Sequence, residues 1–260
     1  ILLIICIILS FMPLFSDLDA QGASRKTAFG DPDKIDVLIV TSGHHFNRES
    51  FFGIFKCDDI AYSEYTLKDE SEVFEDISAW NYDVILLYNM TQQISPKRQE
   101  NFVRLLKEKG IGLVVMHHAQ AAFQSWREYH YIIGTAYIYF DVEIDGKPWP
   151  HGKVHEGLHI PISVVDDRHP ITRGMKDFEI IDETYMGRWW AQDNHLLLTT
   201  SHPENDEPIA WTRKYGKSNV FNIQLGHDEQ AHNCPEFREL LIRGIRWTAE
   251  AASVAAEPGV

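Results

Sequence analysis

Three apolar runs separated by helix-like segments constrain the fold more than any other feature of this sequence. The runs are IDVLIVT at 35–41, VILLY at 84–88 and LVVM at 113–116. Because each run is mainly apolar and does not alternate with polar residues, it is typical of a strand that is covered on both faces of a sheet. Repetition of such strands with helices between them predicts a parallel sheet in an α/β domain.

The segments between these runs carry helix signals. The best-marked helix follows Ser95, a suitable N-cap, because Pro96 suits the first helical position and Gly110 suits the end. Asn47 can cap an earlier helix. Three less strongly marked elements are also expected, namely helices at 47–56 and 70–80 and a strand at 62–67.

The second half of the chain is richer in strands. A hairpin turn is expected at 215–218 (YGKS), between strands at 209–214 and 220–225. An amphipathic helix at 235–249 closes the domain. Further strands are expected at 160–165, 178–181 and 195–200, and the Gly- and Pro-rich stretch 138–159 is expected to be a long surface excursion.

The first 15 residues (ILLIICIILSFMPLF) are almost wholly apolar. This run is shorter than the about 20 residues that a membrane-spanning helix needs, and it fits the apolar region of a signal peptide. Ala20 suits a cleavage point, so we expect a periplasmic or secreted protein whose mature start lies between residues 16 and 32; a signal anchor is the alternative. The expected organisation is a signal segment and start at 1–30, one domain at 31–252 and a tail at 253–260.

The net charge of −14 and the pI of about 5.3 argue against nucleic acid and anionic membrane surfaces as partners. A neutral or cationic small molecule is a better match, and no membrane contact is expected after signal cleavage. The chain could form a homo-oligomer. After the signal segment only Cys57 and Cys234 remain, which is too few for a disulfide framework.

Polar residues gather where the predicted strands end. Ligands bind outside the carboxyl ends of the strands in open parallel sheets, so these residues are the site candidates. Each also has a plain structural role open to it, as a solvated turn residue, a packed side chain or a cap. The candidates are His44, His117, His118, Glu183, Tyr185, Gln224, His227 and Asp228.

Histidine transfers protons near neutral pH and is a common metal ligand, and a neighbouring carboxylate can fix its tautomer. We therefore expect His117, His227 and Glu183 to act as catalytic acids and bases, with His118 and Asp228 beside them. The same trio could instead bind a divalent metal with an open position for water or substrate. No HExxH or CxxC spacing supports a zinc site, so acid–base chemistry is the first hypothesis; no other cofactor is expected.

Nucleophilic catalysis has little support in the sequence. There is no G-x-S-x-G elbow, and neither Cys57 nor Cys234 lies at a strand end, where an activated thiolate would be needed. The turn at 42–44 (SGH) lacks the glycine pattern of a phosphate-binding loop.

Aromatic residues fall in loops or just past strands and could stack on the apolar face of a sugar ring. The alternative for each is a place in the core, because tryptophan is usually highly buried. With His44, Tyr185 and Gln224, Trp126 is expected to bind substrate. The other aromatic candidates are Trp149, Trp189 and Trp190.

Four ordered motifs resemble the ThuA-like (trehalose utilisation) family. They are GLVVMHHAQAAFQSWREY at 112–129, HPITRGMKDFEIIDETY at 169–185, PIAWTRKYGKSNVFNIQLGHD at 208–228 and FRELLIRGIRWTAE at 237–250. The resemblance covers about 35–250. The chain departs from the family pattern at Ser218 and Asn219 in the hairpin and over 136–159.

The resemblance implies a class I glutamine amidotransferase-like fold, a flavodoxin-like three-layer α/β sandwich, here with added β-strands in the C-terminal half. Amidotransferases of this fold keep a Cys nucleophile on the elbow after a central strand, with His and Glu completing a triad. His117 falls at that elbow and His227 falls near the triad His. The histidine in place of the elbow Cys argues against amidotransferase activity. The family name implies a carbohydrate substrate, a disaccharide or its 3-keto derivative.

Three hypotheses follow. The first is a carbohydrate hydrolase or isomerase that uses His and Glu. The second is a non-catalytic carbohydrate-binding protein that kept the crevice without the nucleophile. The third, a true amidotransferase or thiol hydrolase, is disfavoured by the missing elbow Cys.

Overall fold

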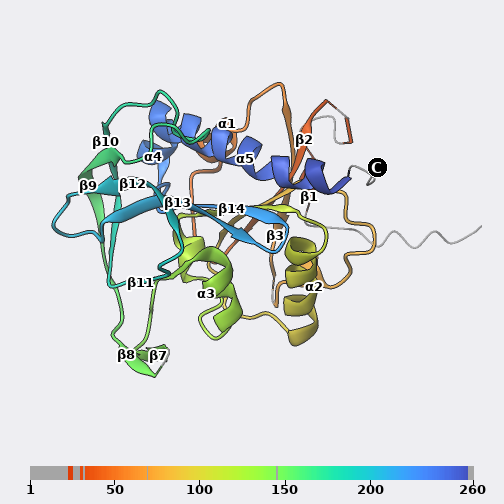
Figure 1. The fold of residues 1–260 in the computed structure, drawn as a ribbon, viewed down its shortest axis with the longest axis horizontal. Coiled ribbons are helices and arrows are strands. Elements are labelled where there is room, and N and C mark those ends of the chain that lie inside the picture. The colour runs from red at the N-terminus through yellow and green to blue at the C-terminus, as the bar shows by residue number, and fades with distance from the viewer. Residues whose placement is uncertain (1–22, 26–29, 32, 69, 145, 257–260) are drawn as a thin grey trace, which may run out of the picture.

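The computed structural model describes residues 23–25, 30–31, 33–68, 70–144 and 146–256 (Figure 1). The predicted signal segment and its Ala20 cleavage point lie outside the described residues, so export stays a prediction. Among the helices that are described, none combines the length and the apolar character that crossing a bilayer requires.

A ten-stranded mixed sheet forms the centre of the domain (Figure 1). Five neighbouring strands are parallel, in the order β3-β2-β4-β5-β14. They are β3 (Ile60–Thr66), β2 (Ile35–Ser42), β4 (Val84–Asn89), β5 (Gly112–Met116) and β14 (Ser218–Ile223). The predicted parallel α/β sheet is confirmed, and the shared strand direction places the carboxyl ends of these five strands at one edge.

Antiparallel strands extend the sheet on both sides of this parallel centre. β1 (Ala23–Arg25) pairs with β3. Beyond β14 lie β13 (Pro208–Tyr215), β12 (His195–Thr200), β9 (Lys153–Val164) and β10 (Phe178–Met186). The added strands that were expected in the C-terminal half are therefore confirmed, as is the hairpin, in which Tyr215 pairs with Ser218.

Helices cover both faces of the sheet (Figure 1). α1 (Arg48–Gly53), α4 (Glu229–Asn233) and α5 (Pro235–Ala256) lie on one face, and α2 (Pro96–Lys107) and α3 (Arg127–Ile133) lie on the other. The central strands are buried on both sides, as their mainly apolar sequences predict. The flavodoxin-like three-layer arrangement expected from the sequence is confirmed.

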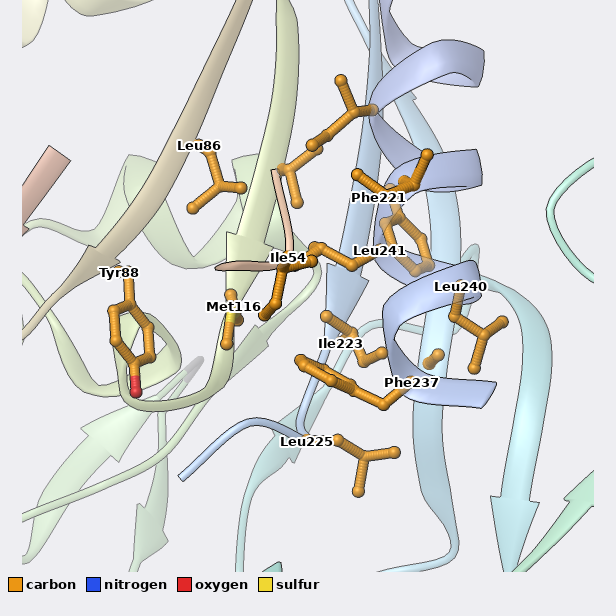
Figure 2. Close-up of a cluster of buried hydrophobic side chains, with 14 of the residues drawn as sticks. Ile54, Leu86, Tyr88, Met116, Phe221, Ile223, Leu225, Phe237, Leu240 and Leu241 are labelled. Atoms are coloured by element: carbon orange, nitrogen blue, oxygen red, sulfur yellow. The ribbon is translucent and has the colours of Figure 1, made fainter. Parts of the chain in front are cut away.

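α5 packs tightly on β14 (Figure 2). Phe237, Leu240 and Leu241 are fully buried in one cluster with Phe221 and Ile223 of β14. Burying an apolar side chain of this size contributes about 1.5–3 kcal/mol. Gly244 lets the helix come this close, because a Cβ at that position would lie 2.2 Å from Cδ1 of Phe221.

The helix expected at 70–80 is wrong. Only a single 3₁₀ turn forms there, η1 (Glu72–Phe74). Ser71, just before it, has a left-handed backbone with φ 65°, and its hydroxyl donates to the carbonyl of Gln93. Asp76 then accepts the backbone N–H of Ser78 at 2.9 Å. These local side-chain hydrogen bonds compete with helix formation on both sides of the turn.

The stretch 138–159, expected to be a long surface excursion, is largely exposed and carries strands of its own. β7 (Val142–Ile144) and β8 (Lys147–Trp149) form a small hairpin at its tip, and β9 begins within it. Just ahead of the hairpin, β6 (Thr135–Ala136) pairs with β11 (Trp189–Trp190).

The helix ends match the expected caps with small shifts. Asn47 accepts the backbone N–H of Ser50 and caps α1, which ends at Gly53 rather than at residue 56. Ser95 precedes α2 and Pro96 begins it. α5 continues to Ala256, four residues past the expected domain boundary at 252.

Candidate functional site

His117 lies directly after β5, the central parallel strand, at the first position of the 3₁₀ helix η2 (His117–Ala121). Its backbone has φ 52°, a left-handed conformation that is uncommon for a residue other than glycine. The side chain is fully buried. Nδ1 lies 2.7 Å from the carbonyl oxygen of Gln224 and donates to it, since a carbonyl can only accept. Nε2 is left to face the site.

Two further groups that can bind a metal or carry a proton lie beside Nε2 of His117. Nδ1 of His227 lies 3.1 Å away and Oε2 of Glu183 lies 3.3 Å away. The distance between His227 Nδ1 and Glu183 Oε2 is 3.7 Å. The structure thus brings His117, Glu183 and His227 together, with one ligand atom of each residue within 4.8 Å of the others.

Glu183 reaches this position from inside a strand, not after one. The expected strand at 178–181 is longer in the structure, because β10 continues to Met186. The pairing between β9 and β10 shifts register around Glu183, where β9 carries one extra residue and Gly157 has φ 68°. Bulges of this kind are common beside active sites, where they redirect a side chain.

Asp182 holds two parts of the trio in place. Its buried carboxylate accepts the backbone N–H groups of Gly226 at 2.7 Å, His227 at 3.0 Å and Glu183 at 2.8 Å. One carboxylate therefore fixes the turn that carries His227 against the strand that carries Glu183.

The electrostatics of the trio are coupled. Burial acts to lower the pKa of His117, but the hydrogen bond to Glu183 and the charges of Asp182 and Glu183 outweigh it and raise the pKa. Burial acts to raise the pKa of Glu183, but its interactions with His117 and His227 hold that pKa below the usual value. The site therefore favours a negative Glu183 opposite a positive charge at His117, either a proton or a bound cation.

Two imidazole nitrogens and one carboxylate oxygen are a donor set that zinc-type sites use when they keep a position open for water or substrate. The hydrogen bond from His117 Nδ1 to a carbonyl is the usual outer-shell support for such a ligand, because it fixes the tautomer with Nε2 free. His117, Glu183 and His227 are therefore the residues that could hold a divalent cation.

A cavity of about 110 Å³ opens beside the trio. Glu183 and Tyr185 line it, together with His44 and His118. The imidazoles of His44 and His118 are stacked, with centroids 4.6 Å apart, and the ring of His44 lies 5.3 Å from that of His227. The Tyr185 hydroxyl lies 3.3 Å from Nε2 of His117.

The other candidates are elsewhere. Trp126 is buried between α2 and α3, in a cluster with Phe102 and Tyr129, and does not line the cavity. The side chain of Gln224 is buried and does not line the cavity; its amide donates to the backbone carbonyl of Glu183 at 3.1 Å and bonds to Asn205, and its own carbonyl accepts from His117. Asp228 is the N-cap of α4, where it accepts from the N–H groups of Gln230 and Ala231. Trp149, Trp189 and Trp190 are also absent from the lining residues.

Several lining residues were missed from the sequence. Tyr137 and Tyr139 form much of the wall, and its apolar part comes from Met90, Ala121 and Val154. The only sequence signal was the alternation of tyrosines in TAYIYF at 135–140, which places both on one side of an extended segment.

The comparisons with known proteins agree with this fold. The family described as ThuA, trehalose utilisation, matches residues 36–248. A ThuA-like protein from Parabacteroides merdae is 21% identical, with a TM-score of 0.68 over 83% of this chain and 90% of that chain. A ThuA-like protein from Bacteroides uniformis is 17% identical, with a TM-score of 0.57 over 85% and 94%.

A protein from Thermoplasma acidophilum that is described as a GMP synthase subunit is 9% identical and has a TM-score of 0.54 over 86% of this chain and 98% of that chain. At these identities the structures are evidence of the fold alone. No curated protein sequence matches the chain. The match over 36–248 spans most of its length, and the chain belongs to the ThuA (trehalose utilisation) family, on a glutamine amidotransferase-like fold.

Proposed function

We propose that this protein is an enzyme that acts on a sugar, as a hydrolase or isomerase, through His117, Glu183 and His227. The observation that carries the proposal is the convergence of two imidazole nitrogens and a carboxylate oxygen at the carboxyl edge of the sheet, beside a cavity. The sugar is inferred from the description of the family, trehalose utilisation, and a disaccharide or its 3-keto derivative is the proposed substrate class.

The residues of the site have separate tasks in this proposal. Glu183 accepts a proton or binds a cation, and His117 presents Nε2 because its Nδ1 is held by the Gln224 carbonyl. Burial and the charge of Glu183 raise the pKa of Tyr185 well above the usual value, so its phenol stays protonated and can donate to a substrate oxygen. A divalent cation bound to the trio would polarise a carbonyl or lower the pKa of a bound water.

Thiol chemistry is not part of the proposal. Cys57 and Cys234 are unpaired, neither lines the cavity, and burial raises the pKa of both thiols. His117 stands where the resemblance expects the amidotransferase nucleophile, and an imidazole there cannot form the thioester that glutamine hydrolysis needs.

The test is an activity screen of the purified protein against trehalose and 3-keto-glycosides, with and without a chelator. Turnover that is abolished in His117→Ala supports the proposal, and loss with chelator adds the metal. Sugar binding without turnover would instead support a carbohydrate-binding protein without catalytic activity.

Export is a separate proposal, and N-terminal sequencing of protein from the native host tests whether the mature chain begins between residues 16 and 32.

A further inference from the structure

The cavity beside the trio has a wall made of tyrosine rings. Tyr137 packs against Tyr185 with ring centroids 4.9 Å apart, and against Tyr139 with centroids 5.5 Å apart. Flat aromatic faces with polar edges suit a ligand that has an apolar face and hydroxyl groups around it. Tyr137 and Tyr139 lie far from Tyr185 in the sequence, so the wall forms only when the domain folds.

The charges that line the cavity are unevenly distributed. Glu183 is the only charged side chain among its described lining residues, and neither Lys nor Arg is present there. An anionic ligand group would therefore lie near a carboxylate with no side-chain cation to pair with, which costs binding free energy. A divalent cation on the trio would leave a net positive charge beside the cavity, so the preference for neutral over anionic rings is expected of the metal-free protein.

Unpaired nitrogen atoms provide the polar contacts. His118 is 3% exposed, and neither of its ring nitrogens makes a well-aligned hydrogen bond within the described part of the chain; the same holds for Nδ1 of His44. Buried polar atoms normally have a hydrogen-bond partner, so we expect a bound ligand to supply one to these nitrogens. A hydroxyl group both donates and accepts, and can pair with a ring nitrogen whether or not that nitrogen carries the proton.

The size of the cavity limits the ligand. A volume of about 110 Å³ holds several water molecules, because one water needs about 10–15 Å³ by this measure. It is well below the roughly 300 Å³ at which pockets for drug-sized ligands begin. One ring is therefore the most it can accept, and the remainder of a larger substrate would stay outside.

We propose that this cavity is a subsite for one uncharged, polyhydroxylated ring of the substrate, which it selects over carboxylated or phosphorylated rings. Tyr137 and Tyr139 form the stacking wall, and His118 with His44 bonds the hydroxyl groups. The inference deepens the proposed function and rests on it for the assignment of the ring to a substrate. Binding can nevertheless be measured without turnover.

The charge argument is tested with two lysine variants. Val154 lines the cavity mouth and is 41% exposed, and Val165 is 54% exposed and does not line it. Methyl α-D-glucopyranoside and D-glucuronate are the probes, with binding measured by ligand-detected NMR. The native protein should prefer the glucoside by about tenfold or more. Val154→Lys should reduce that preference by about tenfold through a new cation, and Val165→Lys should not.

Stacking is tested with neighbouring residues. Tyr139→Ala should weaken glucoside binding about tenfold, while Phe140→Ala, at a side chain that is 74% exposed and outside the lining, should leave it unchanged. Equal or tighter binding of glucuronate by the native protein, an unchanged preference in Val154→Lys, or no binding of either probe would overturn the subsite. Glucoside binding without turnover of any sugar would contradict the proposed enzymatic function and support the subsite. Turnover of charged sugars alone would support the enzymatic function and contradict the subsite.

Discussion

The Nδ1 atom of His117 donates a 2.7 Å hydrogen bond to the backbone carbonyl of Gln224, and this contact fixes which nitrogen faces the site. Gln224 follows β14 and His117 follows β5, two strands that are neighbours in the sheet. The register of that strand pair therefore sets the orientation of the imidazole. Nε2 is left beside Glu183 and His227, as a metal ligand or proton carrier requires.

Asp182→Asn should lower the cation affinity and activity of the site, although His117, Glu183 and His227 are all still present. The Asp182 carboxylate accepts from the N–H groups of Gly226 and His227, and an amide presents a donor to one of them. We expect divalent-cation affinity and any activity to fall about 10–100-fold. The visible spectrum of the Co²⁺-loaded protein should also change. An unaltered spectrum in a variant that has only lost stability would show that Asp182 supports the fold and not the trio.

Replacing both described cysteines with serine should leave activity and ligand binding unchanged. Cys57 and Cys234 are unpaired and lie outside the cavity lining, and burial raises the pKa of each thiol. Steady-state kinetics of Cys57→Ser/Cys234→Ser against the native protein measures this. Complete loss of activity in a double variant that still folds would return the thiol nucleophile to consideration.

The fold was predictable from the sequence wherever the hydrophobic pattern alone identified an element. The apolar runs around Val37, Leu86 and Val114 are short and rich in β-branched residues, which favours buried strands, and the parallel-sheet rule then placed His44, His117 and His227 at one edge. The helix expected at 70–80 failed because local hydrogen bonds of Ser71 and Asp76 are not visible in a periodic pattern.

The candidate site was predictable only in part, for a similar reason. Tyr137 and Tyr139 follow a two-residue strand, β6, whose place depends on pairing with β11 more than 50 residues later. The direction in which the Glu183 side chain points depends on the extra residue in β9 and on the left-handed backbone of Gly157. Trp126 could not be placed from the sequence, because a tryptophan before a helix looks the same whether it packs inward or faces a ligand.

Stability should fall with decreasing pH because of His130. Burial and the nearby Arg127 lower the pKa of His130 to about 4, against about 6.5 in an unfolded chain. Between these values the unfolded chain binds a proton that the folded protein does not, so the free energy of unfolding decreases as pH falls from 6.5 to 4. His130→Gln should reduce this loss by about 1–3 kcal/mol in urea unfolding. His151→Gln, at an exposed position, is the control; equal slopes in both variants would contradict the assignment.

Gly244→Ala should destabilise the protein, although alanine usually favours a helix over glycine by about 1 kcal/mol. The new Cβ would lie 2.2 Å from Cδ1 of Phe221, so α5 or the ring must move, at a cost of about 1–3 kcal/mol. Gly53→Ala is the matched control, because its Cβ would meet nothing closer than Arg238 Nη2 at 3.8 Å. Thermal unfolding should show a lower Tm for Gly244→Ala alone, and a raised Tm would mean that the helix is not packed so closely.

The central claim is that His117, Glu183 and His227 form one site, and titration of the metal-free protein with Co²⁺ or Zn²⁺ tests it most directly. The native protein should bind one ion per chain, and His117→Ala should bind it at least about 100-fold more weakly because one of three ligands is gone. His159→Ala removes an exposed histidine outside the trio and should leave the affinity unchanged. Calorimetry that finds no bound ion in the native protein, or equal affinity in His117→Ala, would contradict the assignment of His117, Glu183 and His227 as a cation site.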